Sequence, residues 1–402
     1  MSATSPRERR RMVHICHESS FATDPDADGS DYLYVPAEGI SYTEGTEILT
    51  TSYSTGRNYA TESEVGADGG EVTFSTPLLG LSSAAGAGVN ASTVTADWLD
   101  RLLEATFGVA ATTAGVAATG GSTTTFTAAT SVGAAQDLEA LFTSATPSGA
   151  PRTLWTQLQS ITGSGPYTYN LAPTLAAAAT SSTVSYGIKR YSDDDNGGPT
   201  LAVVVTDDAL VYTYLGGRVT RCRITAQAKQ RVMVEWTIAF DRRSLDTGKS
   251  SLPAAAVLPY TPIKLMRSPV IFNNAAIPTR MIEIDFGLTA SEVSDTAGVN
   301  GRGAHELISI SPTVTIEPLR ADSHDQLKRA LTRGALVAQL GAGVLESSRL
   351  NTCALHLARC EAREVSYTAD NGITRNRIVF TAVDPIEFSA GVASRFMSFA
   401  RA

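Results

Sequence analysis

Charged residues, histidine and cysteine are all scarce in this sequence of 402 residues. Asp, Glu, Lys and Arg together make up 18% of it, and histidine occurs five times. No run of about 18 apolar residues is present, which argues against a membrane-spanning helix. The segment Met1–Met12 is rich in arginine, but no apolar run follows it, so it lacks the pattern of a secretion signal. The net charge of −8 disfavours general binding to nucleic acid.

Patterns of redox and catalytic chemistry are also missing. The four cysteines contain no C-x-x-C pair, and we interpret them as reduced thiols inside cores; they are Cys16, Cys222, Cys353 and Cys360. No G-x-S-x-G or H-E-x-x-H motif occurs, and the glycine-rich loops Gly298–Gly303 and Gly341–Gly343 lack the strand–helix context of a phosphate cradle. We therefore predict no catalytic residue, no cofactor-binding residue, no metal ligand and no enzymatic activity.

Two clusters come closest to a metal site. His14, Cys16 and His17 are adjacent, but on a strand His17 points away from the other two, so three ligands do not converge. Asp24–Asp31 places carboxylates at alternate positions before a glycine, as calcium loops do, but the position that should supply a bidentate carboxylate is Val35. We interpret this segment as a solvated acidic turn, as we do Asp193–Gly198, and calcium at the first remains the alternative.

What the sequence does contain indicates a β-rich protein. Apolar residues make up 43%, with 33 glycines among many Thr, Ser and Ala. Glu71–Pro77 alternates apolar and polar side chains, and Arg231–Asp241 does so over five apolar positions, the strongest strand pattern here. Asp370–Gly372 predicts a hairpin turn.

Two helices are predicted. Thr95–Gly108 is amphipathic, with Thr95 as N-cap, an apolar stripe and Gly108 as the C-terminal stop; the stripe consists of Trp98, Leu99, Leu102 and Leu103. Ser323–Gly334 predicts a shorter helix with a capping box formed by Ser323 and Gln326.

The order of these elements repeats. Val72 and Val314 lie 242 positions apart (314 − 72), Gly108 and Gly334 lie 226 apart, Cys222 and Cys360 lie 138 apart, and Asp241 and Asp384 lie 143 apart. The drop of 88 between the helices and the following strands predicts an insertion in the first copy. We expect this insertion to form a small β-rich domain around Trp155 that decorates one face.

The predicted organisation is mainly β, with two tandem units that each carry one flanking helix. The basic run Arg218–Arg223 is expected on an outer face or at a subunit interface. The predicted boundaries are 1–30 for an N-terminal arm, 31–108 with 200–243 for the first unit, 109–199 for the insertion, 244–269 for an extended linker, and 270–402 for the second unit.

This pattern resembles the tail tube (major tail) proteins of long-tailed bacteriophages. The strand–loop–helix Glu71–Gly108 and the stretch Leu215–Asp241 carry the resemblance, which covers both halves but not the insertion. It implies two β-sandwich or split-barrel units whose sheets join between subunits into a ring. It also implies a structural virion protein, located in the tail and made in the host cytoplasm, whose stacked rings form a hollow tube for DNA delivery. A duplicated chain would form trimeric, pseudo-hexameric rings.

The same resemblance implies partners and leaves alternatives. Besides copies of itself, the partners would be the tape measure protein and the terminator or distal tail proteins, with DNA passing through unbound. The N-terminal arm or a long loop at Ser41–Gly70 would bridge successive rings. Six-membered rings, and a related terminator or distal tail protein, stay open. The alternative function is an extracellular, adhesin-like β-domain protein that binds a glycan or calcium, as suggested by Asp24–Asp31; a Cys/His hydrolase has no supporting spacing.

Overall fold

The computed structural model is mainly β, with 65% strand, 7% helix and several antiparallel sheets, as predicted. No helix in its described part is long and apolar enough to cross a membrane. The structure describes residues 11–50, 63–82, 97–108, 110–112, 116–130, 139–144, 152–172, 182–185, 189–192, 198–207, 210–245, 249–255, 262–266, 268–294, 302–329, 332–341, 345–346, 349–350, 352–370, 372–383 and 397–401.

The first repeat is built around one long strand. The first half of this strand, β15, pairs with β14 and β17, and its second half pairs with β16. Further pairings are β2–β1–β14 and β3–β4–β16. The strands are β1 (Arg11–His17), β2 (Leu33–Val35), β3 (Glu38–Thr50), β4 (Ser63–Pro77), β14 (Leu201–Asp207), β15 (Leu210–Gln227), β16 (Met233–Phe240) and β17 (Arg242–Leu245).

Two expectations about this region are wrong. Residues 11–17 form β1 within the sheet, between β2 and β14, and not part of an extended arm. Ser41–Gly70 is not a loop, because its described residues belong to the β3–β4 hairpin. In both places the strand is short or contains glycine, so the alternation of apolar and polar residues is weak in the sequence. Pairing with neighbouring strands nevertheless fixes the extended conformation.

The second repeat uses the same arrangement. Its long strand, β27, pairs with β24 and β29 through its first half and with β28 through its second half. Its strands are β18 (Val270–Phe272), β19 (Ala275–Ile277), β20 (Thr279–Asp285), β21 (Leu288–Ser294), β22 (Arg302–Ile310), β23 (Thr313–Pro318), β24 (Arg333–Leu340), β27 (Cys353–Asp370), β28 (Ile373–Ala382) and β29 (Met397–Arg401). Strands β20–β21 and β22–β23 together form one long hairpin, the counterpart of β3–β4.

The two repeats agree in register residue by residue. In the hairpins, Tyr42 lies opposite Val72 as Ile284 lies opposite Val314, a shift of 242 on both strands. Near the hairpin ends, Thr50 lies opposite Ser63 as Glu292 lies opposite His305, again shifted by 242 (292 − 50 and 305 − 63). An irregularity interrupts both hairpins between these points.

The long strands agree equally well. Val219 lies opposite Ile238 as Ala362 lies opposite Phe380, and a bulge follows immediately in both repeats. The shift is 143 on the long strand (362 − 219) and 142 on its partner (380 − 238). The counterpart of Cys222 is therefore Val365, and that of Asp241 is Val383, so the predicted matches with Cys360 and Asp384 are wrong. Short identities in the sequence misplaced the alignment, whereas backbone pairing fixes it.

Each repeat has one helix against its long strand. Helix α1 (Trp98–Phe107) contacts β15, and α2 (Asp322–Arg329) contacts β27. The N-cap of α1 is Asp97 and not Thr95, because the Asp97 carboxylate accepts from the Asp100 N–H. As predicted, α1 ends at Gly108 and the apolar stripe of the helix is buried. Helix α2 begins before Ser323, and the Asn376 side chain accepts from the Ala321 N–H at 3.1 Å. Gly334 lies in β24 and does not end the helix.

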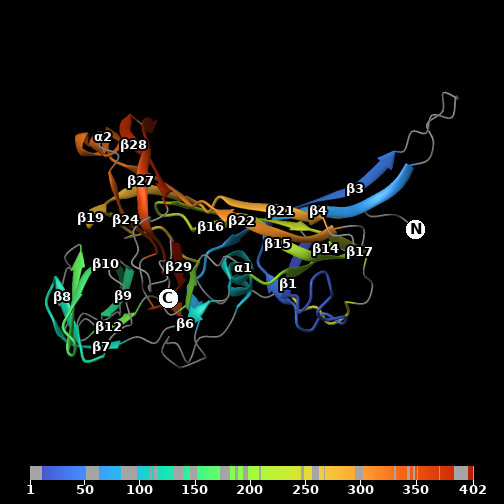
Figure 1. Cartoon of the computed structure of the whole chain (residues 1–402), viewed down its shortest axis with the longest axis horizontal. Helices are drawn as coiled ribbons and strands as arrows, with labels where there is room; N and C mark the ends of the chain where they lie inside the picture. The colour runs from blue at the N-terminus through green and yellow to red at the C-terminus, as the bar shows by residue number, and fades with distance from the viewer. Residues whose placement is uncertain are drawn as a thin grey trace.

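The insertion contains a closed six-stranded barrel at one end of the molecule (Figure 1). Phe126 and Tyr169 stack inside it with ring centroids 4.3 Å apart, while the predicted core residue Trp155 lies in β10, where its side chain is outside the described residues. Strand β13 joins the insertion to β29 of the second repeat. The strands are β6 (Ala111–Thr112), β7 (Val116–Gly121), β8 (Thr125–Ala128), β9 (Glu139–Ser144), β10 (Arg152–Thr162), β11 (Tyr167–Ala172), β12 (Ser182–Ser185) and β13 (Lys189–Ser192).

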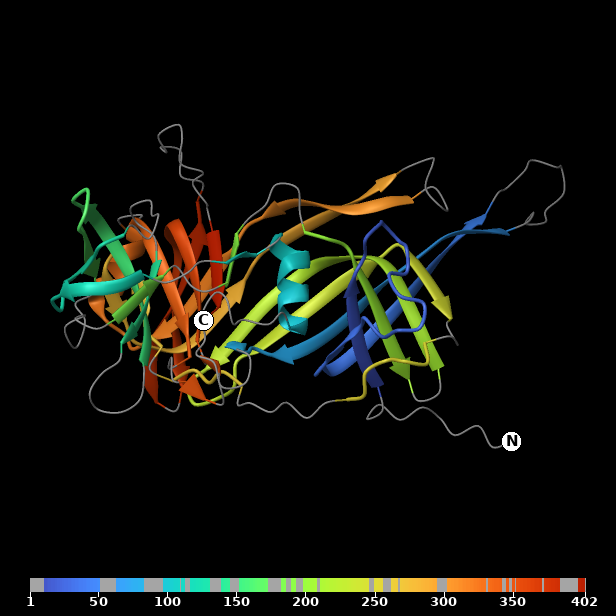
Figure 2. The same cartoon turned by 90° about the horizontal axis from the view of Figure 1, so that it is seen from below.

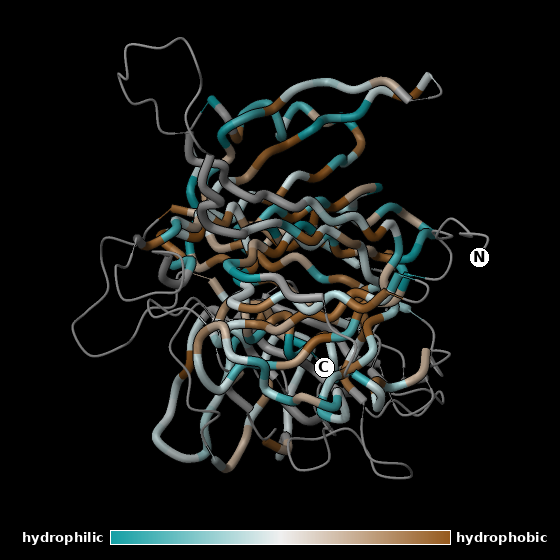
Figure 3. The backbone as a smooth tube through the Cα atoms, turned by 90° about the vertical axis from the view of Figure 1, so that its right-hand side faces the viewer, coloured by the Kyte–Doolittle hydropathy of each residue, from teal (hydrophilic) through white to brown (hydrophobic). Residues whose placement is uncertain are grey.

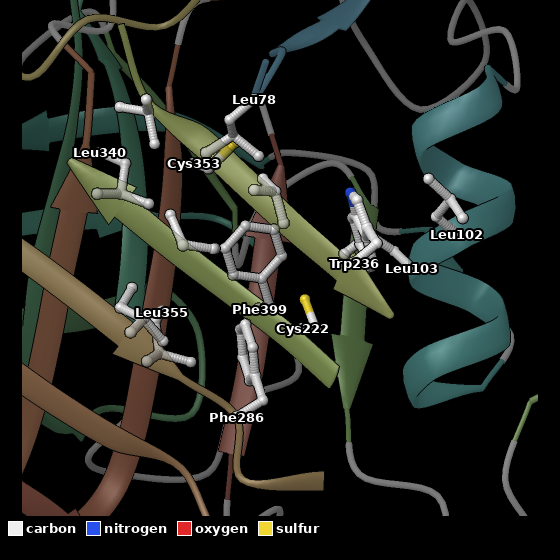
Figure 4. Close-up of a cluster of buried hydrophobic side chains, with 14 of the residues drawn as sticks. Leu78, Leu102, Leu103, Cys222, Trp236, Phe286, Leu340, Cys353, Leu355 and Phe399 are labelled. Atoms are coloured by element: carbon white, nitrogen blue, oxygen red, sulfur yellow. The ribbon is translucent and has the colours of Figure 1, made fainter. Parts of the chain in front are cut away.

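One apolar core runs through both repeats. Trp236 and Cys222 of the first repeat belong to the same buried cluster as Phe286, Leu355 and Phe399 of the second (Figure 4). Hydrophobic residues accordingly concentrate along the paired strands in the middle of the molecule (Figure 3). A small sheet of β5 (Leu81–Ser82), β26 (Arg349–Leu350) and β25 (Leu345–Glu346) also links the repeats.

A buried ionic network fastens the C-terminal strand to α1. The fully buried Arg401 guanidinium donates to Asp97 Oδ2 at 2.9 Å and to Asp100 Oδ1, and also to the carbonyl oxygens of Leu79 and Gly80. Tyr191 of β13 donates its hydroxyl to Asp100, and burial, followed by the Asp100 charge, raises the pKa of Tyr191. The network thus connects both repeats and the insertion.

The predicted linker is only partly an extended surface segment. Its first residues form β17, Lys249 is buried, and Ile263 is buried with its N–H donating to the Leu78 carbonyl at 3.0 Å. The proline-rich composition of this segment predicts an extended chain and does not indicate these buried contacts.

Candidate functional site

The most extensive candidate site is one continuous sheet that crosses from the first repeat into the second. Its strand order is β3–β4–β16–β15–β20–β23–β28–β27, and every neighbouring pair is antiparallel. One face is apolar and buried, with Val72, Trp236, Ile284 and Phe380 among its side chains. Because side chains alternate along a strand, the opposite face carries the intervening residues.

That opposite face is polar. Neighbouring side chains pair across it: Thr73 Oγ1 lies 3.3 Å from Thr237 Oγ1, and Arg221 lies 3.3 Å from Glu235. Arg223 donates to Glu283 at 2.6 Å, and this hydrogen bond raises the pKa of Arg223. A face of threonines and paired charges offers few uncompensated cations to an anionic polymer.

The two repeats meet where β15 pairs with β20. Arg223 lies opposite Asp285, Ile224 opposite Ile284, and the pairing continues to Gln227 opposite Met281. Within the described residues this joint is the only strand ladder that connects the two hairpin sheets, and the Arg223–Glu283 ion pair spans it. A strand of the second repeat therefore completes the sheet of the first.

The same two edges occur once more, at the outer ends of the sheet. The counterpart of β15 residues 223–227 is β27 residues 366–370, and the counterpart of β20 residues 281–285 is β3 residues 39–43. Neither edge has a strand partner within the part of the chain that the structure describes. An unpaired edge offers its N–H and C=O groups to another chain.

The basic run Arg218–Arg223 is divided between two environments. Arg221 and Arg223 lie on the polar face. Arg218 is buried, donates to the carbonyl oxygens of Gly198 and, at 3.1 Å, His305, and burial lowers its pKa. The predicted outer-face or interface position therefore holds for two of these arginines and is wrong for Arg218.

The acidic loop Asp24–Asp31 surrounds a lysine. Lys249 is fully buried, and its Nζ lies 2.8 and 2.6 Å from the two Asp24 oxygens, contacts the Asp26 carbonyl, and sits 4.7 Å from the centre of the Tyr32 ring. Asp26 accepts from the backbone N–H of Asp31 at 2.7 Å, which lowers the pKa of Asp26. The Lys249 ammonium group therefore pairs with the Asp24 carboxylate. Because Lys249 lies more than 200 positions away in the sequence, the local pattern could not predict this partner.

The histidines near β1 bond to different segments. His14 Nε2 lies 2.8 Å from the Pro253 carbonyl, and His17 Nε2 lies 2.9 Å from the Arg101 carbonyl. Burial lowers the pKa of both imidazoles. Across the residues that the structure describes, no three His, Cys, Asp or Glu side chains gather as a metal site.

The remaining loops singled out in the sequence are largely outside the described residues. This applies to residues 193–197, 295–301 and 342–344, which include most of the acidic turn at Asp193–Gly198 and most of both glycine-rich loops. No protein-family model matches this chain, and neither does any curated protein sequence.

Proposed function

We propose that this chain is a self-assembling structural subunit whose copies join edge to edge into rings, and that the stacked rings form a hollow tail tube of a long-tailed bacteriophage. The observation that carries the proposal is the joint between β15 and β20, together with the two equivalent edges that lack a partner strand. The chain thus contains one completed example of the contact that assembly requires.

The proposed contact follows from the register of the internal joint. Applying the shifts of 143 and 242 places Tyr367 of one copy opposite Tyr42 of the next, and Thr368 opposite Ser41. Ser366 then lies opposite Thr43. Small polar pairs and an aromatic pair across antiparallel strands are favourable combinations.

Closure of the ring removes both exposed edges at once, which is the usual solution for a sheet that would otherwise aggregate. Because each copy supplies two repeats, three copies give a pseudo-hexameric ring. The polar face of the sheet would line the channel, where paired charges and threonines let DNA pass without holding its phosphates.

The glycan- or calcium-binding alternative receives less support. Its distinguishing feature was the acidic loop, and Asp24 of that loop is already paired with Lys249. The proposal therefore rests on assembly and on no bound ligand.

Cysteine cross-linking tests the proposed register. Two single variants, Ser41→Cys and Thr368→Cys, are mixed in a Cys16→Ser background, since Cys16 is the one native cysteine that is not buried. Directly opposite Cβ atoms lie about 4.5–5.5 Å apart, within reach of a disulfide after small adjustments, whereas diagonal pairs lie about 7–8 Å apart. We expect a cross-linked dimer from this mixture and none from the mixture of Ser41→Cys with Ser366→Cys.

Negative-stain microscopy of the uncross-linked protein at rising concentration provides the second readout. Rings or hollow tubes with three- or sixfold end views are expected. Monomers that neither cross-link nor assemble at any concentration would overturn the proposal.

A further inference from the structure

The chain has two equivalent hairpin ends, which we call arms. Arm 1 comprises residues 46–50 of β3 paired with residues 63–68 of β4, and arm 2 comprises β21 paired with β22. Both extend toward the same end of the molecule (Figure 2). Arm 2 lies over the first repeat, whereas arm 1 projects beyond the body.

Arm 2 is fastened to the first repeat by a specific pair. His305 Nδ1 lies 2.8 Å from Asp241 Oδ1, with 15% and 4% of the two side chains exposed. The His305 carbonyl also accepts from Arg218 Nε at 3.1 Å. The two side chains lie at ion-pair distance in a nearly dry setting, and together with the Arg218 hydrogen bond they hold the arm against β15.

Arm 1 has the same backbone but not the same fastening. The counterpart of His305 is Ser63, and that of Asp241 is Val383. The counterpart of Arg218 is Glu361, whose carboxylate lies 2.7 Å from Arg333 and cannot donate to a carbonyl oxygen. All three groups that hold arm 2 are therefore replaced.

We propose that arm 1 docks on the second repeat of a neighbouring copy, across β27 and beside Val383, in the place that arm 2 occupies on β15. This inference rests on the proposed function, because the edge-to-edge joint brings β3 of one copy beside β27 of another. Without the His–Asp pair, docking of arm 1 is weaker than that of arm 2, so the arm engages only once the joint has formed.

Cross-linking again provides the direct test. Mixed Ser63→Cys and Val383→Cys chains, with Cys16→Ser, are expected to form an interchain disulfide under conditions in which the Ser41→Cys and Thr368→Cys pair also forms. Pairing of Ser63→Cys with Arg363→Cys, an exposed position further along β27, serves as the control. A joint that cross-links while residues 63 and 383 do not would overturn this inference and leave the proposed function standing.

Transplanting the fastening offers a gain-of-function test. The double variant Ser63→His/Val383→Asp recreates the pair of arm 2, and we expect it to lower the assembly concentration about tenfold, equivalent to ~1.4 kcal/mol per contact. The gain is expected to be larger at pH 6 than at pH 8, because an imidazolium attracts the carboxylate more strongly. Either single variant should give no gain. An equal gain from a single variant, or no gain from the double variant in protein that assembles, would contradict docking at this position.

Discussion

Replacing Arg401 with methionine should destabilise the whole chain. The side chain is fully buried and makes two ion pairs and two hydrogen bonds to carbonyl oxygens, so its removal leaves the buried Asp100 carboxylate without its counter-ion. Breaking a buried pair from one side costs about 3–5 kcal/mol. This corresponds to a change of about 10²–10⁴ in the folding equilibrium constant.

Urea unfolding followed by tryptophan fluorescence measures this effect. Trp98 is buried in α1, next to Asp97, and reports on the network directly. Because the urea slope grows with the surface exposed on unfolding and is at least ~3 kcal/mol per M for a chain of this length, the midpoint should fall by about 1 M. Arg363→Met is the matched control, because that side chain is 61% exposed and lies 3.8 Å from its partner, so its loss should have little effect.

A triple variant separates charge from packing. Asp97→Asn/Asp100→Asn/Arg401→Met removes every charge of the network and retains an asparagine as helix cap. It should be more stable than Arg401→Met alone, because no unpaired buried charge is left. The reasoning would be refuted if the free energy of unfolding of Arg401→Met lay within about 1 kcal/mol of the native value. It would also be refuted if the triple variant were less stable than Arg401→Met.

Two further predictions concern the loop around Lys249 and the buried histidines. Lys249→Met should lower the free energy of unfolding by ~2 kcal/mol, because the partly buried Asp24 loses its counter-ion. Calcium or a chelator should leave the melting temperature of the native protein unchanged. A rise in melting temperature with calcium would contradict the pairing of Lys249 with Asp24. Burial lowers the folded-state pKa of His14 and His17, so their contribution to stability is present above the unfolded value near 6.5 and is lost as pH falls through the folded values. His14→Gln should therefore reduce the acid sensitivity seen in thermal melts between pH 7 and pH 5, and an unchanged profile would exclude His14 as a cause.

The β-rich class and several individual elements could be predicted because their signals are local. Alternation in Glu71–Pro77 and Arg231–Asp241 matches β4 and β16, and the turn at Asp370–Gly372 joins β27 to β28. The end of α1 at Gly108 needs only a residue that tolerates its positive φ of 99°. In each case one or two neighbouring residues decide the structure.

The remaining features depend on partners distant in sequence. The Ala321 N–H just before α2 donates to Asn376, and Asp24 of the acidic loop pairs with Lys249, more than 200 positions away. The predicted alignment of the two repeats was wrong at Cys222, because it compared residue types. The long strands β15 and β27 share the position of a bulge and not the residues around it. Register, which defines the candidate interface, is a property of paired strands and is invisible in one strand alone.

Covalent linkage of the two repeats changes how the newly made chain behaves before it meets other copies. Each repeat by itself would present two bare sheet edges, and the β15–β20 joint hides one edge from each. The tandem chain thus carries half as many adhesive edges per repeat as separate repeats would. In the proposed ring, fewer exposed edges would reduce premature aggregation at high expression, and one of every two contacts would form at the high effective concentration of a tethered partner.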